Sequence, residues 1–287
     1  MTTSAVAIKN NLKTTLLLGA LIGLFVAVGS IWGTTGMVVG LLFGGLMNVV
    51  SFWYSDKIAI AAMRGRELTP ETGGDLLTMV HELADNAGLP RPRVYLCPHD
   101  APNAFATGRS PKHAAVAFTQ GAVRLLSPDE LRGVAAHELA HIKNRDTLTS
   151  TIAATVSGVL AFLAYWGFWL GMGNSRNANP LVTIGVVVVA AVGAAMIKAM
   201  ISRSREFVAD AEGARIAGSP RGLMNALQKL DAYSRRIPHQ QPNPAPNTRF
   251  IIEPRASNAR GGNPLIKLFA THPPTEDRLA SLRKLAN

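Results

Sequence analysis

The feature that most constrains this chain is a long stretch without a charged side chain, residues 14–55. It is about twice the ~20 residues that a helix needs to cross the hydrocarbon core of a bilayer. The sequence GTTG at 33–36 offers a turn near its middle. We therefore expect a helical hairpin in a membrane. The second apolar run, at 37–54, argues against a cleaved secretory signal, which has one short apolar core.

Two further apolar stretches follow later in the chain, at 147–175 and 177–197, and the polar sequence GNSRNANP lies at their junction. This pattern predicts a second hairpin of two spans, and a buried core element of a large soluble domain is the alternative. The composition agrees with an integral membrane protein, because 48% of the residues are hydrophobic and only 16% are charged.

Basic residues gather at the outer ends of the four expected spans, whereas the two turns together hold one. The flanking residues are Lys9, Lys13, Lys57, Arg64, Arg66, Lys143, Arg145, Lys198, Arg203 and Arg205. Positive charge beside a span stays on the cytoplasmic side. We therefore expect hairpins at 1–56 and 149–202, and cytoplasmic parts at 57–148 and 203–287 with both termini. This topology also accounts for the net charge of +11, so nucleic acid is not an expected partner.

The part between the hairpins predicts a small α+β domain. A helix is expected from Thr69, which can cap it, to Gly88, which can end it, with an apolar stripe between them. Ser127 and Glu130 then match a capping box that begins a helix through HELAH at 137–141. Short strands are expected at 94–97, 104–107 and 114–119.

The sequence HELAH predicts a metal site. His137 and His141 lie one helical turn apart on one face, so that a ring nitrogen of each can bind the same ion. Glu138 lies beside them, where its carboxylate can take a proton from a metal-bound water without being a ligand. The chain also contains HELAD at 81–85, in which Asp85 replaces the second histidine. We interpret HELAD as the polar side of an amphipathic helix.

A catalytic zinc ion requires three protein ligands and one open position. His141 precedes the second expected hairpin and Glu206 follows it, so antiparallel spans would return Glu206 to the histidines. Asp210 lies one helical turn after Glu206 and suits a hydrogen bond to a ligand histidine. The reverse assignment of these two carboxylates is the alternative. Without HELAH, the same segment would indicate only a helix with an acidic face.

Four motifs in this order resemble the HtpX family of membrane zinc metallopeptidases, which are relatives of the CaaX prenyl endopeptidases. They are NAFATG at 103–108, HELAH at 137–141, EFVAD at 206–210 and THPPTEDR at 271–278. The resemblance covers nearly the whole chain. It implies a gluzincin-type domain with one zinc ion on His137, His141 and Glu206, and with Glu138 as general base. It also implies a protease of the bacterial cytoplasmic membrane that degrades damaged or misfolded membrane proteins.

The resemblance also bears on two less specific sites. Asn103 and Ala104 begin a segment that resembles the edge strand with which gluzincins pair a substrate backbone, and an asparagine turn before a strand is the alternative. His272 either stabilises the oxyanion of the tetrahedral intermediate or caps the last helix. The role of Arg278 stays open. The stretch at 235–263, rich in Pro, Asn, Arg and Gly, is either a loop that gates the cleft or a connector.

The expected protein is thus a mainly α integral membrane protein with four transmembrane helices in two hairpins and a cytoplasmic α+β metallopeptidase domain containing a small sheet. Its expected partners are membrane-protein or peptide substrates and the lipid bilayer. Two other functions were weighed. A metal transporter would carry ionisable residues inside its spans, which these spans lack. A catalytically silent scaffold that binds membrane proteins is disfavoured by the intact Glu138.

Overall fold

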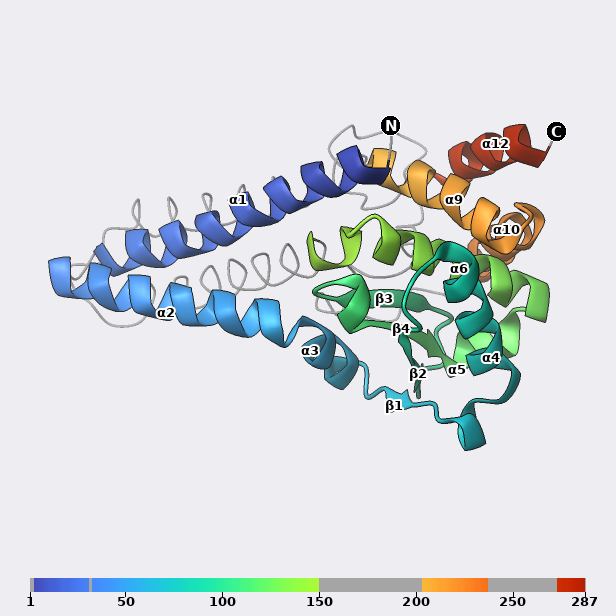
Figure 1. The fold of residues 1–287 in the computed structure, drawn as a ribbon, viewed down its shortest axis with the longest axis horizontal. Coiled ribbons are helices and arrows are strands. Elements are labelled where there is room, and N and C mark those ends of the chain that lie inside the picture. The colour runs from blue at the N-terminus through green and yellow to red at the C-terminus, as the bar shows by residue number, and fades with distance from the viewer. Residues whose placement is uncertain (1–2, 31–32, 150–202, 237–272, 287) are drawn as a thin grey trace.

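The computed structural model describes residues 3–30, 33–149, 203–236 and 273–286. Most of the second expected hairpin, nearly all of the stretch expected as a loop at 235–263, and His272 lie outside these ranges. The described residues form a helical hairpin at the N-terminus and a mainly helical domain with a small sheet (Figure 1).

The N-terminal hairpin consists of two long helices, α1 (Thr3–Gly29) and α2 (Gly33–Trp53). They lie side by side and extend away from the rest of the described chain (Figure 1). Each contains a stretch that is long and apolar enough to cross a membrane. Large apolar side chains such as Leu42 and Leu46 are exposed along α2. Contiguous exposed apolar surface of this kind is typical of a helix that contacts lipid.

The turn between these helices lies before the predicted position, so the prediction of a turn at 33–36 is wrong. α2 already begins at Gly33, whose φ is +73°. A Cβ on Gly29 would lie 2.1 Å from the carbonyl oxygen of Gly36. Gly33 and Gly36 therefore lie in the first turn of α2, and Gly29 at the end of α1 lets the two helices approach closely.

A four-stranded sheet follows the hairpin after the short helix α3 (Ser55–Ala62). In spatial order its strands are β1 (Arg66–Glu67), β2 (Arg93–Cys97), β4 (Ala114–Thr119) and β3 (Ala104–Gly108). β2 and β4 pair in parallel, whereas both outer strands are antiparallel to their neighbours. The three predicted strands are confirmed. β1 was missed, because two residues are too few to show a strand pattern.

The helices of the domain are α4 (Pro70–Ala87), α5 (Gln120–Leu125), α6 (Pro128–Lys143), α9 (Arg203–Ala217), α10 (Arg221–Arg236) and α12 (Thr275–Ala286), with a 3₁₀ turn, η2 (Pro111–His113), between β3 and β4. Two of these helices, α4 and α6, begin where local sequence signals predict. Thr69 caps α4, and Gly88 ends it with a φ of +67°. At the start of α6 the Ser127 hydroxyl accepts the Glu130 N–H, and the Glu130 carboxylate accepts the Ser127 N–H at 2.8 Å. The predicted capping box is confirmed.

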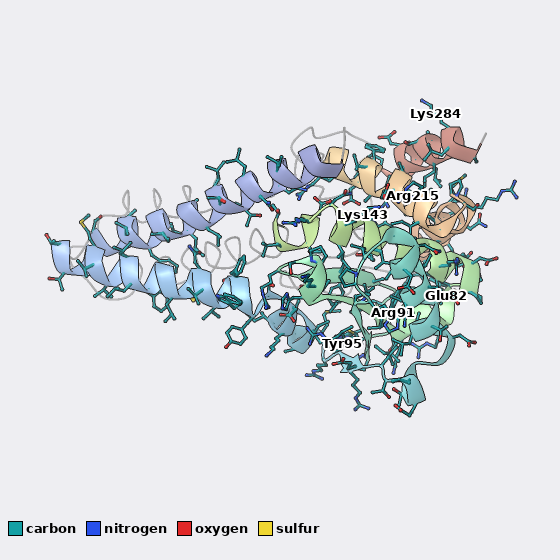
Figure 2. The ribbon with its side chains drawn as sticks, viewed as in Figure 1. Glu82, Arg91, Tyr95, Lys143, Arg215 and Lys284 are labelled. Carbon is teal, nitrogen blue, oxygen red and sulfur yellow. The ribbon has the colours of Figure 1, made fainter. Side chains whose placement is uncertain are left out.

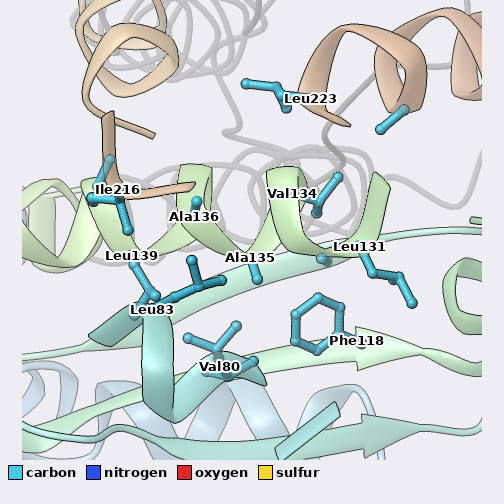
Figure 3. Close-up of a cluster of buried hydrophobic side chains, with 14 of the residues drawn as sticks. Val80, Leu83, Phe118, Leu131, Val134, Ala135, Ala136, Leu139, Ile216 and Leu223 are labelled. Carbon is cyan, nitrogen blue, oxygen red and sulfur yellow. The ribbon is translucent and has the colours of Figure 1, made fainter. Parts of the chain in front are cut away.

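The core is centred on α6, in which every residue from 133 to 140 is buried. Val80 of α4 and Phe118 of β4 belong to the cluster on its sheet side, and Leu223 of α10 belongs to the opposite side (Figure 3). Residues that precede and follow the undescribed segment 150–202 therefore share one core. Since α6 carries HELAH, this motif lies on the most enclosed helix of the described structure.

At the surface an ion pair joins Lys143 of α6 to Glu212 of α9, and a second ion pair to Glu212 lies within α9. The Lys143 Nζ lies 2.7 Å from Glu212 Oε1, and the Arg215 Nη2 lies 2.8 Å from the same oxygen. Lys143 and Arg215 are labelled in Figure 2. The hydrogen bond from Arg215, together with Lys143, outweighs partial burial and lowers the pKa of Glu212 to about 2.

Candidate metal and catalytic centre

Three side chains from α6 and α9 converge in the core. The His137 and His141 Nε2 atoms lie 3.2 Å apart. Glu206 places Oε2 at 3.6 Å from the His137 Nε2 and Oε1 at 3.7 Å from the His141 Nε2. A Cβ on Gly213 would lie 3.0 Å from the His137 backbone, so this glycine lets α9 approach α6 closely. These three are the residues that form a metal-binding group within the described ranges.

The spacing of these three groups fits a zinc ion. Zn–N and Zn–O bonds of about 2.0–2.2 Å at tetrahedral angles place ligand atoms about 3.3 Å from one another. The three observed separations are 3.2, 3.6 and 3.7 Å. Two histidines and one carboxylate also leave a fourth tetrahedral position for water or substrate. The donor set therefore suits a metal ion with an open coordination site.

The carboxylates of this cluster favour positive charge between the two rings. Burial lowers the pKa of His137, but its hydrogen bonds to Asp210 and Glu206 outweigh burial and raise the value to about 9. For His141 burial again acts first and downward, and Asp146 and Glu206 raise the pKa above its ordinary value. A bound cation would satisfy the same electrostatic demand that these protons meet.

A carboxylate orients each of the two histidines through its second ring nitrogen. Asp210 Oδ1 lies 3.0 Å from the His137 Nδ1, and Asp146 Oδ2 lies 3.2 Å from the His141 Nδ1. Such contacts fix the ring and its tautomer, so that Nε2 remains available to a metal. The sequence analysis singled out Asp210 but missed Asp146. Its position five residues after His141, just past the end of α6, was the available signal.

Arg278 of α12 binds Asp210, the carboxylate that orients His137. Its guanidinium donates to both oxygens of Asp210, at 2.9 Å from Nε and 2.6 Å from Nη2, and both side chains are 1% exposed. Burial raises the pKa of Asp210, but the charge and hydrogen bonds of Arg278 lower it by more, so the net shift is downward. The residue whose role was left open thus keeps Asp210 ionised.

The first membrane helix reaches the second orienting carboxylate. The side-chain amide of Asn10 on α1 donates to Asp146 Oδ1 at 2.5 Å and to the Asn144 carbonyl at 2.9 Å. One turn later, the hydroxyls of Thr14 and Thr149 lie 2.8 Å apart. Arg205 Nη1 also lies 3.5 Å from Asp146 Oδ1. The contacts of Asn10 and Thr14 join positions more than 130 residues apart in sequence, and that of Arg205 joins positions 59 apart, so no local pattern could have predicted them.

The edge strand β3 contacts Glu138 directly. The Ala106 N–H donates to Glu138 Oε2 at 2.8 Å. The side of β3 that is not paired with β4 therefore faces α6. Asn103 precedes the strand, where its backbone N–H donates to the Thr119 hydroxyl at 2.8 Å, and Ala104 pairs with Phe118 of β4. Sequence analysis singled out Asn103 and Ala104 but missed Ala106, because a backbone amide has no side-chain signature.

The HELAD residues lie apart from this cluster on the surface of α4. His81 Nε2 is 3.2 Å from the Pro92 carbonyl, and Asp85 accepts two hydrogen bonds from Arg91. Glu82 pairs weakly with Arg132 at 3.5 Å. Glu82 and Arg91 are labelled in Figure 2. The prediction that HELAD forms the polar side of a helix is confirmed.

Comparison with known proteins identifies relatives along nearly the whole chain. A protein named Protease HtpX homolog from Desulforapulum autotrophicum is 45% identical over 282 residues, which are 96% of this chain and 89% of that one. The corresponding protein of Desulfatibacillum aliphaticivorans is 47% identical over 281 residues, 95% of this chain and 89% of that one. That of Burkholderia ambifaria is 46% identical over 280 residues, 96% of this chain and 97% of that one.

A solved structure shares the fold. The crystal structure of S. mikatae Ste24p aligns with a TM-score of 0.54 at 18% identity, and the alignment covers 97% of this chain and 67% of Ste24p. The sequence pattern of Peptidase family M48 matches residues 70–286, which include every member of the cluster on α6 and α9. The resemblance seen in the sequence is confirmed, and the chain belongs to peptidase family M48.

Proposed function

We propose that this metalloprotease is a membrane-bound zinc endopeptidase in which His137, His141 and Glu206 bind one zinc ion and Glu138 is the general base. The observation that carries the proposal is the convergence of three ligand atoms within 4.8 Å of one another, on the same helix as Glu138. Zinc, when bound there, supplies a Lewis acid that polarises the scissile carbonyl and lowers the pKa of water.

The side chains around this site have separate roles in the proposed reaction. Glu138 accepts a proton from the attacking water and later passes it to the leaving amine. Asp210 and Asp146 hold a proton at Nδ1 of His137 and His141, which directs each Nε2 toward the ligand position. In this proposal the assignment of Glu206 to the metal and Asp210 to its support follows from their distances to the His137 ring nitrogens, 3.6 Å to Nε2 and 3.0 Å to Nδ1.

We propose that the substrate binds as an extended strand along β3. Asn103 and Ala104 would begin this platform, and the contact between the Ala106 N–H and Glu138 supports it, because that contact places the unpaired side of β3 beside the general base. Strand addition reads mainly the peptide backbone and tolerates many sequences. This breadth suits the degradation of damaged or misfolded membrane proteins. His272 is proposed to stabilise the oxyanion, with helix capping as the alternative.

For the architecture we propose four transmembrane helices in two hairpins, at 1–56 and 149–202, and a gluzincin-type domain assembled from residues 57–148 and 203–287. The flanking positive charges support a multi-pass protein of the bacterial inner membrane with both termini and the active site in the cytoplasm. The core shared by α6, α9, α10 and α12 supports one domain built from both halves.

Zinc content and casein cleavage test the proposed function on detergent-purified protein. We expect about one zinc ion per chain and chelator-sensitive cleavage in the wild type. Glu138→Gln should keep the zinc and lose cleavage by about 10²–10⁴-fold, and His137→Ala should lose both. Retained cleavage in Glu138→Gln would refute the general-base role. Zinc without cleavage in any preparation would favour the scaffold.

A further inference from the structure

A basic pocket lies where α2 ends and α3 begins. Figure 1 shows that this junction connects the hairpin to the domain. It has a volume of about 540 Å³, within the range of small-molecule sites. Its lining includes Trp53, Tyr54, Lys57, Arg93, Arg109 and Lys112. The pocket is separate from the metal centre, since none of its lining residues belongs to that cluster.

The pocket carries an excess of positive charge. Four lining cations face one lining carboxylate, Asp56, giving a net charge of +3 from 4 − 1 if His113 is left aside. Asp56 is buried and already paired with Arg93. Within the described part of the chain, Lys57, Arg109 and Lys112 form no ion pair with a carboxylate. Three cations are therefore available to an anionic ligand.

Aromatic residues at the end of the membrane helix hold two of these cations in place. The Arg109 guanidinium lies 4.8 Å from the centre of the Trp53 ring, and its Nη1 donates to the Trp53 carbonyl at 3.3 Å. The Lys57 Nζ lies 5.4 Å from the centre of the Tyr54 ring. Trp and Tyr are enriched at the level of lipid headgroups, where one part of the side chain is apolar and the other is polar.

An exposed apolar stripe of α2 leads into this pocket. Leu42, Leu46, Val49 and Trp53 follow the 4-3-4 spacing of one helix face, and all four are more than half exposed. Val49 and Trp53 are also part of the pocket lining. One continuous surface therefore combines an apolar track along a membrane helix with a cationic pocket at its end. The apolar track matches the acyl chain of a phospholipid, and the cationic pocket matches its anionic phosphate.

We propose that this pocket binds the phosphate headgroup of an anionic phospholipid whose acyl chain lies along the α2 stripe. Arg109 and Lys112 on the β3–η2 segment and Lys57 on α3 contact the headgroup. The bound lipid thereby joins α2 to the sheet that carries the edge strand β3. The ligand is a membrane lipid rather than free phosphate, because the stripe leads directly into the pocket.

Equilibrium binding of phosphatidylglycerol and of phosphatidylcholine with identical acyl chains tests the proposal. The full chain in dodecylmaltoside micelles is titrated with each lipid, and bound lipid is counted by native mass spectrometry. We expect phosphatidylglycerol to bind more tightly than phosphatidylcholine. Arg109→Gln/Lys112→Gln should weaken phosphatidylglycerol binding by about tenfold or more, because each cation near an anionic lipid contributes about 1 kcal/mol.

The matched control is Arg64→Gln/Arg66→Gln, which removes the same charge at the end of α3 and the start of β1, outside the pocket lining. It should bind phosphatidylglycerol as the wild type does. Equal loss in the control would refute the pocket in favour of diffuse surface charge, and equal binding of both lipids would refute recognition of an anionic phospholipid by the net charge of its headgroup. If inorganic phosphate at millimolar concentration displaces the lipid completely, the site binds free phosphate and the lipid assignment fails.

Zinc content of the double variant, measured on the same samples, reports whether the fold is intact. If the double variant does not fold, Lys112→Gln alone replaces it, since Lys112 is exposed and makes no hydrogen bond or ion pair among the described residues. Unchanged phosphatidylglycerol binding in the folded variant would also overturn the proposal.

Discussion

Two nearly identical pentapeptides, HELAH on α6 and HELAD on α4, have opposite environments. Both are helical, and both place an aspartate–arginine pair nearby. In HELAD, Arg91 donates to both oxygens of Asp85 at the surface, where the side chains are 62% and 49% exposed. Behind HELAH, Arg278 donates to both oxygens of Asp210 with 1% of each side chain exposed. Both pairs have two hydrogen bonds and differ mainly in burial, and Asp210 also contacts His137.

The largest difference is expected when each arginine is removed. Arg278→Met removes the guanidinium partner of the buried Asp210 and leaves only its contact with His137, and it should lower the free energy of unfolding by about 3–5 kcal/mol. Arg91→Met should change it by about 1 kcal/mol or less, because exposed ion pairs are weak. Thermal unfolding of both variants in detergent checks this. Similar losses in the two variants would show that burial does not separate the pairs.

The next effect concerns the carboxylate behind His141. Asp146→Ala should weaken zinc binding by about 10–100-fold, as removal of a histidine's hydrogen-bond partner typically does. Asp85→Ala should leave zinc affinity unchanged. Competition with a chelating dye measures both. Asn10→Ala, which removes only the amide that holds Asp146, should have a smaller effect in the same direction, and rescue by Asn10→Gln would support a positioning role.

A smaller effect on stability is expected at Glu212 of α9, which pairs with Lys143 of α6. The depressed pKa of Glu212 stabilises the folded chain above its ordinary value of 4.5, and this contribution is lost as the pH falls from there toward about 2. Glu212→Gln should therefore destabilise the protein at pH 7 by about 1 kcal/mol or less, and the difference from wild type should vanish near pH 2. Denaturant unfolding at several pH values measures it. A difference that grows on acidification would contradict the assignment.

The smallest expected effect comes from completing the second motif. Asp85→His turns HELAD into a second HELAH, yet the zinc content should stay at about one ion per chain. Within the described ranges, no acidic side chain of another helix approaches His81 as Glu206 approaches His137. Metal analysis of the variant decides the matter, and a second tightly bound ion would show that the pentapeptide alone is sufficient.

This comparison also indicates what the sequence could predict. Capping signals at Thr69 and Ser127 are local, and both were interpreted correctly. The return of Glu206 to the histidines was predicted from the hairpin between them, and the structure places its carboxylate 3.6 Å from the His137 Nε2. Local pattern and topology were enough for these features.

The support of the site was much harder to predict. Asp146, Asn10 and Arg278 act through contacts between distant segments, and their roles depend on which elements pack together. Ala106 contributes a backbone N–H, which any residue except proline could supply. The turn between α1 and α2 was misplaced because a glycine with a positive φ, such as Gly33, can begin a helix as well as form a turn.

The contact of Asn10 with Asp146 places the metal cluster close to the start of the apolar stretch of α1. Asn10 begins the apolar stretch of α1, and it is one hydrogen bond away from the carboxylate behind His141. With α1 in the bilayer, the scissile bond must come to the plane of the headgroups. An intact transmembrane helix keeps its peptide bonds below that plane and within its own hydrogen bonds. In the proposed function, only chains that have slipped out of the bilayer or lost their helical structure can present an extended segment there, so damage itself would select the substrate.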